Sequence, residues 1–248
     1  MSKTVLITGG ANGIGRATAL ELAKNKYDIV INYLTSEEKA LQLQKTITEE
    51  YRVNCLAIKA DISKEDEVDA MVSQIEKQLG GVDILINNAA IDLSNLFHLK
   101  TADEFRRTLD VNVVGAYICS RRVYSHMKQQ EYGRIINISS TNGINTYFPM
   151  CFDYDASKAA LISLTHNLAM QFAPYVNVNA IAPGFIGTEN ELDGYDEEFL
   201  KEETRKILVE RYGQPEEVAY LIKFLISDQA DYINNTVIRI DGGQKGSC

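Results

Sequence analysis

Tyr154 and Lys158, two residues that could transfer a proton, stand four positions apart in the chain. On a helix, this spacing places both side chains on one face. An unperturbed tyrosine ionises near pH ~10, and a neighbouring cation favours its ionised form. A tyrosine paired with an ammonium is therefore a candidate acid for protonating the alkoxide that forms when hydride adds to a carbonyl. The same spacing also occurs by chance in amphipathic helices, so this interpretation depends on the partners of the pair.

Serine hydroxyls supply one such partner. Ser139 ends the predicted strand Arg134–Ser139, and Ser140 follows it directly. In open α/β sheets, ligands bind at the carboxyl ends of the strands. A serine hydroxyl at such an end can hold a carbonyl oxygen and orient it toward the tyrosine. The three residue types together indicate carbonyl reduction or alcohol oxidation.

A glycine-rich turn near the start of the chain indicates a second ligand. Gly9, Gly13 and Gly15 stand between an apolar run, Thr4–Thr8, and a helical pattern, Ile14–Asn25. Glycine permits positive φ and a close approach of backbone to a pyrophosphate, and the helix that follows offers free N–H groups. A tight turn without any ligand is the alternative. At the first strand–helix junction of an α/β chain, this glycine spacing favours dinucleotide binding.

Strand and helix patterns alternate along the whole chain, as they must to position these residues. This alternation predicts one α/β domain over residues 1–248, a doubly wound parallel sheet of about seven strands with helices on both faces. We expect residues 185–210, which are strongly acidic and weakly periodic, to form a substrate lid. The predicted strands are Thr4–Thr8, Ile29–Ile31, Val53–Lys59, Val82–Ile86, Arg134–Ser139, Val176–Ile181 and Thr236–Ile240. The predicted helices are Ile14–Asn25, Ser36–Glu50, Ser63–Leu79, Ala102–Gln130, Ala156–Phe172 and Glu216–Ser227.

The overall composition excludes several classes of partner. The 248 residues are 45% hydrophobic and carry a formal net charge of −9, which argues against nucleic acid and anionic membranes as partners. No apolar run approaches the ~18 residues of a membrane span, and no targeting segment precedes the first strand, so we expect a cytoplasmic protein. No histidine or cysteine spacing suggests a metal site. The cysteines form no CxxC pair and no disulfide framework: Cys55, Cys119, Cys151 and Cys248.

Four motifs in order and register resemble those of the short-chain dehydrogenase/reductase family. They are Thr8-Gly-x-x-x-Gly-x-Gly15, Asn87-Asn-Ala-Ala90, Tyr154-x-x-x-Lys158 and Pro183-Gly184. The resemblance covers Lys3 to Gly243, with Ala90 where the family usually has glycine. It implies a Rossmann fold and a nicotinamide-dependent oxidoreductase that reduces a carbonyl to a secondary alcohol, or the reverse, with Tyr154 as acid/base.

The resemblance also implies roles for individual residues. Ser140 matches the catalytic serine, and Ser139 is then a structural residue. Asn112 matches the family's helix asparagine, whose carbonyl distorts the helix and holds a water linked to the lysine. The catalytic set is therefore Asn112, Ser140, Tyr154 and Lys158. The residues implied to bind the cofactor are Gly9, Asn12, Gly13, Ile14, Gly15, Thr35, Ser36, Asp61, Ile62, Asn88, Ala89, Tyr154, Lys158, Pro183, Gly184, Ile186 and Thr188, with Asp61 and Ile62 on the adenine and 183–188 on the nicotinamide carboxamide.

The choice of nicotinamide cofactor depends on the end of the second predicted strand. An acid there would accept the ribose hydroxyls and repel a 2′-phosphate. Residues 32–36 contain no acid, and Asn12 stands where some NADP-dependent members carry a base. Thr35 and Ser36 could donate hydrogen bonds to a 2′-phosphate. We therefore expect NADP(H), with NAD(H) as the alternative.

The substrate is less constrained than the cofactor. Stretches such as Val178–Gly184 and Tyr212–Glu217 most resemble the 3-oxoacyl-[acyl-carrier-protein] reductases within the family. The acidic balance and Glu131 disfavour docking of an acidic carrier protein, so a small diffusible ketone, alcohol or sugar is the alternative substrate. A dinucleotide-binding sensor without turnover is a further alternative. The resemblance implies a homotetramer, or a homodimer, paired through the helices near 102–130 and 153–172 and near the C-terminus.

Overall fold

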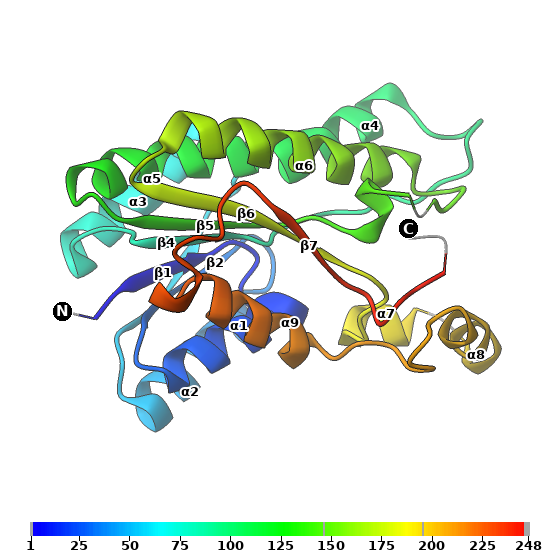
Figure 1. Ribbon diagram of the computed structural model, residues 1–248, viewed down its shortest axis with the longest axis horizontal. Helices are drawn as coiled ribbons and strands as arrows, with labels where there is room; N and C mark the ends of the chain where they lie inside the picture. Colours follow the sequence, from blue (N-terminus) through cyan, green and yellow to red (C-terminus); the bar gives the residue numbers. More distant parts are fainter. Residues whose placement is uncertain (1, 146, 195, 246–248) are drawn as a thin grey trace.

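Seven parallel strands form the centre of the molecule, in the order β3-β2-β1-β4-β5-β6-β7 (Figure 1). The computed structural model describes residues 2–145, 147–194 and 196–245. β1 pairs with both β2 and β4, so the strand order reverses beside β1, where open α/β sheets form their ligand crevice. The strands are β1 (Thr4–Ile7), β2 (Asp28–Tyr33), β3 (Cys55–Lys59), β4 (Ile84–Asn87), β5 (Gly133–Ile138), β6 (Val176–Pro183) and β7 (Val237–Ile240).

Helices cover both faces of the sheet, which confirms the predicted doubly wound architecture. Figure 1 shows α3, α4, α5 and α6 on one face and α1, α2 and α9 on the other. The α-helices are α1 (Gly13–Lys24), α2 (Glu37–Thr46), α3 (Glu65–Leu79), α4 (Ala102–Leu109), α5 (Ala116–Gln129), α6 (Phe152–Phe172), α7 (Glu189–Asp193), α8 (Glu197–Arg205) and α9 (Pro215–Leu225). Short π and 3₁₀ segments are η1 (Ile47–Tyr51), η2 (Asp110–Gly115), η3 (Thr141–Gly143) and η4 (Asp228–Ala230).

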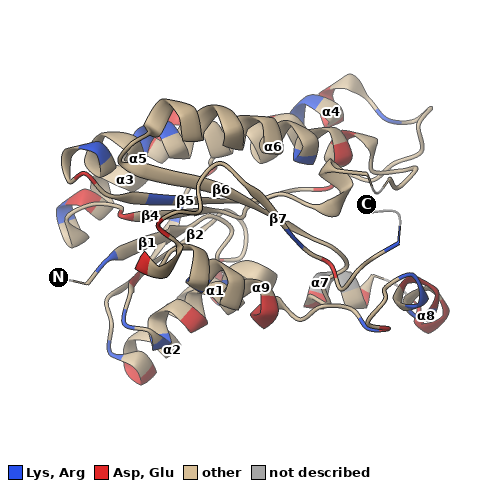
Figure 2. Ribbon diagram, in the orientation of Figure 1, with Lys and Arg blue, Asp and Glu red and all other residues tan. Residues whose placement is uncertain are grey.

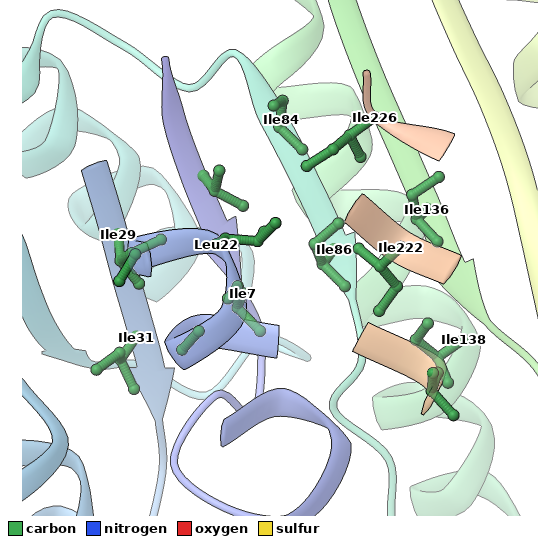
Figure 3. Packing of buried hydrophobic residues seen from close by; sticks show 14 of the residues in the cluster. Ile7, Leu22, Ile29, Ile31, Ile84, Ile86, Ile136, Ile138, Ile222 and Ile226 are labelled. Carbon is green, nitrogen blue, oxygen red and sulfur yellow. The ribbon is translucent and has the colours of Figure 1, made fainter. Parts of the chain in front are cut away.

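Burial on both faces explains why the central strands are continuously apolar. Successive side chains of a strand point to opposite faces, so Ile7 of β1 packs with the α1 and α9 layer and Leu6 with the opposite layer. Figure 3 shows isoleucines of β1, β2, β4 and β5 beside Leu22 of α1 and Ile222 of α9. Each fully buried side chain of this size contributes about 1.5–3 kcal/mol. This core holds the carboxyl ends of the strands in fixed positions.

The segment predicted as one helix, Ala102–Gln130, contains a π-helical turn. η2 separates α4 from α5, and Asn112 lies within it. The Asn112 amide turns toward Ile91, accepting from its N–H at 2.8 Å and donating to its carbonyl at 2.9 Å. π-helical turns are frequent at functional sites. A π-helical turn contains one residue more than an α-helical turn. The hydrophobic pattern does not reveal this residue, because the apolar positions before and after it still recur at helical spacing.

Two predicted helix starts differ from the structure by more than one residue. α6 begins at Phe152 rather than Ala156, so Tyr154 and Lys158 lie on the same helix. α3 begins at Glu65, and Ser63 donates its hydroxyl to Asp61 at 2.6 Å instead of capping the helix. Residues 185–210 hold α7 and α8, which Figure 1 shows at the end of the sheet where β6 terminates. Tyr195, within the predicted lid, lies outside the described residues.

Candidate active site

Tyr154 and Lys158 lie together on α6, with the Lys158 Nζ 5.3 Å from the centroid of the Tyr154 ring. The Lys158 side chain is buried, and its Nζ donates to the carbonyl of Ile138 at 2.8 Å, at the end of β5. Burial lowers the pKa of Lys158 to about 8. The lysine therefore still carries its positive charge at neutral pH, beside the half-buried tyrosine.

The two serines after β5 make different contacts. Ser139 is buried and donates its hydroxyl to the carbonyl of Lys158 at 2.9 Å, so it braces the α6 backbone. Ser140 is half-buried and begins η3, where its Oγ accepts from the Asn142 N–H at 3.1 Å. A Cβ on Gly143 would lie 2.6 Å from the carbonyl carbon of Lys158. The turn after Ser140 is thus packed directly against the helix that carries Tyr154 and Lys158.

Asn112 connects the loop after β4 to α6. Besides its bonds to Ile91, its Nδ2 donates to Ser157 Oγ at 3.0 Å. Ser157 in turn donates to the carbonyl of Tyr154 at 2.7 Å. The asparagine that the sequence singled out therefore reaches the backbone of the tyrosine through one serine.

A cavity of ≈ 480 Å³ lies at the carboxyl ends of β1, β2, β3 and β4. Its position is the point where the strand order reverses, as expected for a dinucleotide crevice. Eleven of the sequence-predicted cofactor residues line it: Gly9, Asn12, Gly13, Ile14, Thr35, Ser36, Asp61, Ile62, Asn88, Ala89 and Thr188.

The glycine turn leaves the start of α1 open to an anion. Gly13 has a φ of 48°, and a Cβ on it would lie 3.1 Å from Thr188 Cγ2, which also lines the cavity. The N-cap residue Asn12 makes no side-chain capping hydrogen bond to α1, and the first turn of the helix carries no acidic residue. Its N–H groups therefore remain available to a pyrophosphate. Gly15 does not line the cavity, and a Cβ there would lie 2.5 Å from the Gly9 carbonyl oxygen, so its role is close packing of helix on turn.

Thr8 ties the glycine turn to the end of β4. Its Oγ1 accepts from the backbone N–H groups of Asn88 at 3.0 Å and of Ala89 at 3.1 Å. The Asn88 side chain donates to the Thr8 carbonyl at 2.9 Å and to the Gly9 carbonyl at 3.1 Å. Asn88 therefore shapes the cavity wall as well as lining it.

Asp61 is an ionised carboxylate in the wall of the cavity. Burial opposes its ionisation, but hydrogen bonds from Ser63 and Arg107 outweigh this and lower the pKa of Asp61. The Arg107 Nη2 lies 3.0 Å from Asp61 Oδ2, and the arginine itself lines the cavity. Sequence reasoning missed Arg107, because no motif marks it on its helix and its partner is far away in the chain.

The segment after β6 reaches the cavity only in part. Thr188 lines it, and so does Glu189, which sequence reasoning also missed. Among the described residues, Pro183, Gly184 and Ile186 lie outside the lining of this cavity. Gly184 donates its N–H to the Ile240 carbonyl at 3.0 Å, and Ile186 is buried and forms a bridge to Gly213. These residues hold the segment that leads to Thr188.

The described part of the chain contains no cluster of His, Cys, Asp or Glu that could hold a metal ion. Burial raises the pKa of Cys55 and Cys119 to about 12 and that of Cys151 to about 11, which disfavours a thiolate nucleophile. Cys248 lies outside the described residues. Within the same ranges, no helix is both long and apolar enough to cross a membrane.

Residues 3–198 match the family described as short chain dehydrogenase. The chain belongs to the short-chain dehydrogenase family. This membership confirms the resemblance, the Rossmann fold and the oxidoreductase class predicted from the sequence. Members of the family use a nicotinamide dinucleotide, and the glycine turn, the open start of α1 and the cavity beside them fit such a group.

Three relatives place the chain within the short-chain dehydrogenases. The 3-oxoacyl-[acyl-carrier-protein] reductase FabG of Staphylococcus aureus (strain Mu50 / ATCC 700699) is 36% identical over 247 residues, which cover 98% of each chain. The structure of acetoin dehydrogenase YohF from Salmonella typhimurium has a TM-score of 0.88 and 33% identity, covering 98% of this chain and 96% of that one. The structure of ElxO with NADP bound has a TM-score of 0.89 and 33% identity, covering 98% of both chains.

Proposed function

We propose that the protein reduces a carbonyl to a secondary alcohol, or oxidises the alcohol, with Tyr154 as the acid/base. The observation that carries this proposal is the buried Lys158 ammonium, 5.3 Å from the centroid of the Tyr154 ring. Their helix is linked to the dinucleotide cavity through Asn112, which bonds to Ser157 of α6 and to the cavity-lining Ile91. The bound nicotinamide would supply the hydride in reduction and take it up in oxidation.

Each proposed catalytic residue has a separate task. Tyr154 donates its phenolic proton to the carbonyl oxygen, and the positive charge of Lys158 stabilises the phenolate that remains. Ser140 holds the same oxygen through its hydroxyl. Asn112, through Ser157, fixes the backbone of Tyr154. We also propose that the Asn112 carbonyl, in the π-helical turn, holds a water on the way to Lys158.

We propose NADP(H) as the preferred cofactor, with NAD(H) as the alternative. The end of β2 has no acid, and the Asn12 side chain donates to Ser36 Oγ at 2.9 Å, which orders the polar rim of the cavity there. Lys39 pairs with the cavity-lining Glu189 at 3.2 Å, so one ammonium lies near this rim. Glu37 and Glu38 in the first turn of α2 act in the opposite direction. The NADP bound to ElxO agrees with the proposed preference.

The proposed substrate is a 3-oxoacyl thioester, in line with the similarity to the Staphylococcus aureus reductase. A small diffusible ketone is the second candidate. It is favoured by the net charge of −9, which opposes docking of an acidic carrier protein, and by the similarity to acetoin dehydrogenase. We propose a cytoplasmic location, which suits either substrate.

An absorbance assay of NADPH and NADH oxidation by the purified protein tests the proposal. The substrates are acetoacetyl-CoA, acetoacetyl carrier protein and diacetyl. We expect turnover with NADPH preferred, and a loss of kcat of at least about 100-fold in Tyr154→Phe because the proton donor is gone. NADPH affinity should change by less than about threefold. Tyr232→Phe, at a fully exposed tyrosine, is the matched control. NADPH binding without turnover of any carbonyl would instead identify a non-catalytic sensor.

We further propose that residues 185–210 act as a lid and that the protein is a homotetramer, or a homodimer, paired through α5 and α6. Glu189 in the proposed lid already lines the cavity. α6 carries no charged residue from Ala159 to Phe172, and Figure 2 shows this long stretch as uncharged. Tyr117 and Met170 are 44% and 73% exposed on these helices. Burial between subunits would remove this apolar surface from water.

A further inference from the structure

Asp155 is a buried carboxylate that the proposed mechanism does not use. It follows Tyr154 on α6 and is 8% exposed. Its Oδ1 accepts from Asn142 Nδ2 at 2.6 Å, and its Oδ2 accepts from the Phe148 N–H at 3.3 Å. Both partners lie in the segment between Ser140 and α6. Asp155, the residue next to Tyr154, is therefore bonded to Asn142, two residues after Ser140.

The bond to Asp155 fixes the orientation of the Asn142 amide. An amide has one donor end and one acceptor end, whereas a carboxylate only accepts. With Nδ2 held by Asp155, Oδ1 faces Ser140, whose Oγ donates to it across 3.4 Å. A rotated amide would place its oxygen against the carboxylate. The Asn142 backbone N–H donates to the same Oγ at 3.1 Å.

We propose that Asp155 and Asn142 are positioning residues that hold the Ser140 hydroxyl in register with the Tyr154 phenol. This inference rests on the proposed function, because it assigns Ser140 and Tyr154 to one carbonyl oxygen. The long bond from Ser140 to Asn142 Oδ1 keeps the hydroxyl proton directed yet weakly held. A substrate oxygen can then replace Asn142 as the acceptor.

A separate anchor holds the start of α6, so the effect of Asp155 is local. The Lys100 ammonium pairs with Asp153 at 2.6 Å, with side chains only 2% and 0% exposed. Thr108 donates to the same carboxylate at 2.7 Å. These contacts bind α6 to α4 and to the loop before it. Loss of the Asp155 bond should therefore release the turn after Ser140 and leave the helix in place.

The test compares Asp155→Asn, Asn142→Asp and the exchanged double variant, Asn142→Asp with Asp155→Asn. We measure kcat and KM with the best substrate found above, NADPH affinity and melting temperature. The single variants should lower kcat by about 10-fold, Asn142→Asp most, because it sets two carboxylates against each other. NADPH affinity should stay within about twofold, since neither residue lines the dinucleotide cavity. Asp92→Asn, which removes another carboxylate that acts electrostatically on Asp155, is the charge control and should keep wild-type kcat.

The exchanged double variant distinguishes an effect on the position of the Ser140 hydroxyl from an effect on folding stability. It restores an amide–carboxylate bond, so the melting temperature should recover. Its kcat should stay at least about 10-fold low, because a carboxylate at position 142 binds the Ser140 proton more strongly than an amide oxygen does. Recovery of kcat together with the melting temperature overturns the proposal, and so does a wild-type kcat in Asp155→Asn.

Hydrogen exchange distinguishes failure of this inference from failure of the proposed function. A wild-type protein that binds NADPH but turns over no carbonyl contradicts the function. In that case, amide exchange over residues 141–145 still tests the positioning bond. Exchange about 10-fold faster in Asp155→Asn supports it, and equal exchange in the two proteins overturns it.

Discussion

The buried Lys158 ammonium lowers the free energy of unfolding of the protein. Its ammonium is buried, and burial alone lowers its pKa from 10.5 to about 8. Between these pH values the unfolded chain binds more protons than the folded one, so stability should rise with pH across that window. Below pH 8 the buried charge costs on the order of 3 kcal/mol.

Lys158→Met should therefore stabilise the protein while abolishing its turnover. At pH 7 we expect the melting temperature to rise by a few degrees and kcat to fall at least about 100-fold, because the buried charge and the phenolate partner disappear together. Calorimetry from pH 7 to 11 should show the gain shrinking above pH 8. Lys77→Met, at an exposed lysine, is the control and should change neither quantity. A lower melting temperature for Lys158→Met at pH 7 would contradict the prediction.

At the scale of elements, α9 depends on the cap at its first turn. Arg211 donates to both Glu217 oxygens at 2.8 Å, and the Gln214 N–H donates to Oε2 at 2.8 Å. These bonds, the arginine first, lower the pKa of Glu217 to about 2. Because α9 packs on α1, the cap also supports the helix that opens onto the dinucleotide cavity.

Glu217→Gln should destabilise the protein in a pH-dependent way. A lowered carboxyl pKa adds stability above pH 4.5, and this is lost as the pH falls toward 2. The group is partly exposed, so we expect a loss of only about 1 kcal/mol at pH 7, the usual size of a lost cap. Urea unfolding at pH 7, 4 and 2.5 measures the difference. The exposed neighbour Glu216→Gln should behave as wild type, and a Glu217→Gln deficit at pH 2.5 as large as that at pH 7 would contradict an ionic cap.

At the scale of the whole molecule, the uncharged length of α6 predicts how subunits pair. Met170→Glu would place a charge in the proposed subunit contact, where an unpaired carboxylate is costly to bury. We expect light scattering to give the mass of a tetramer or dimer for the wild type and a smaller assembly for Met170→Glu. Tyr232→Glu, at a fully exposed site, should keep the wild-type mass. A wild-type monomer would remove the proposed interface.

The sequence by itself determined the features that rest on local patterns. Continuously apolar strands, the glycine turn and the Tyr154–Lys158 spacing each follow from neighbouring residues, and they were enough to predict the sheet, the cavity and the family. Helix boundaries were less secure, because the start of α6 is held by a buried ion pair between Asp153 and the distant Lys100.

Only the tertiary structure decided the features that join distant segments. Arg107 reaches the cavity because Asp61, 46 residues away, holds it there. The π-helical turn forms around an Asn112 amide that bonds to Ile91. The pKa of Lys158 falls because packing removes water from its ammonium. Contacts across the fold and exclusion of solvent leave no local mark in the chain, so no motif could have revealed them.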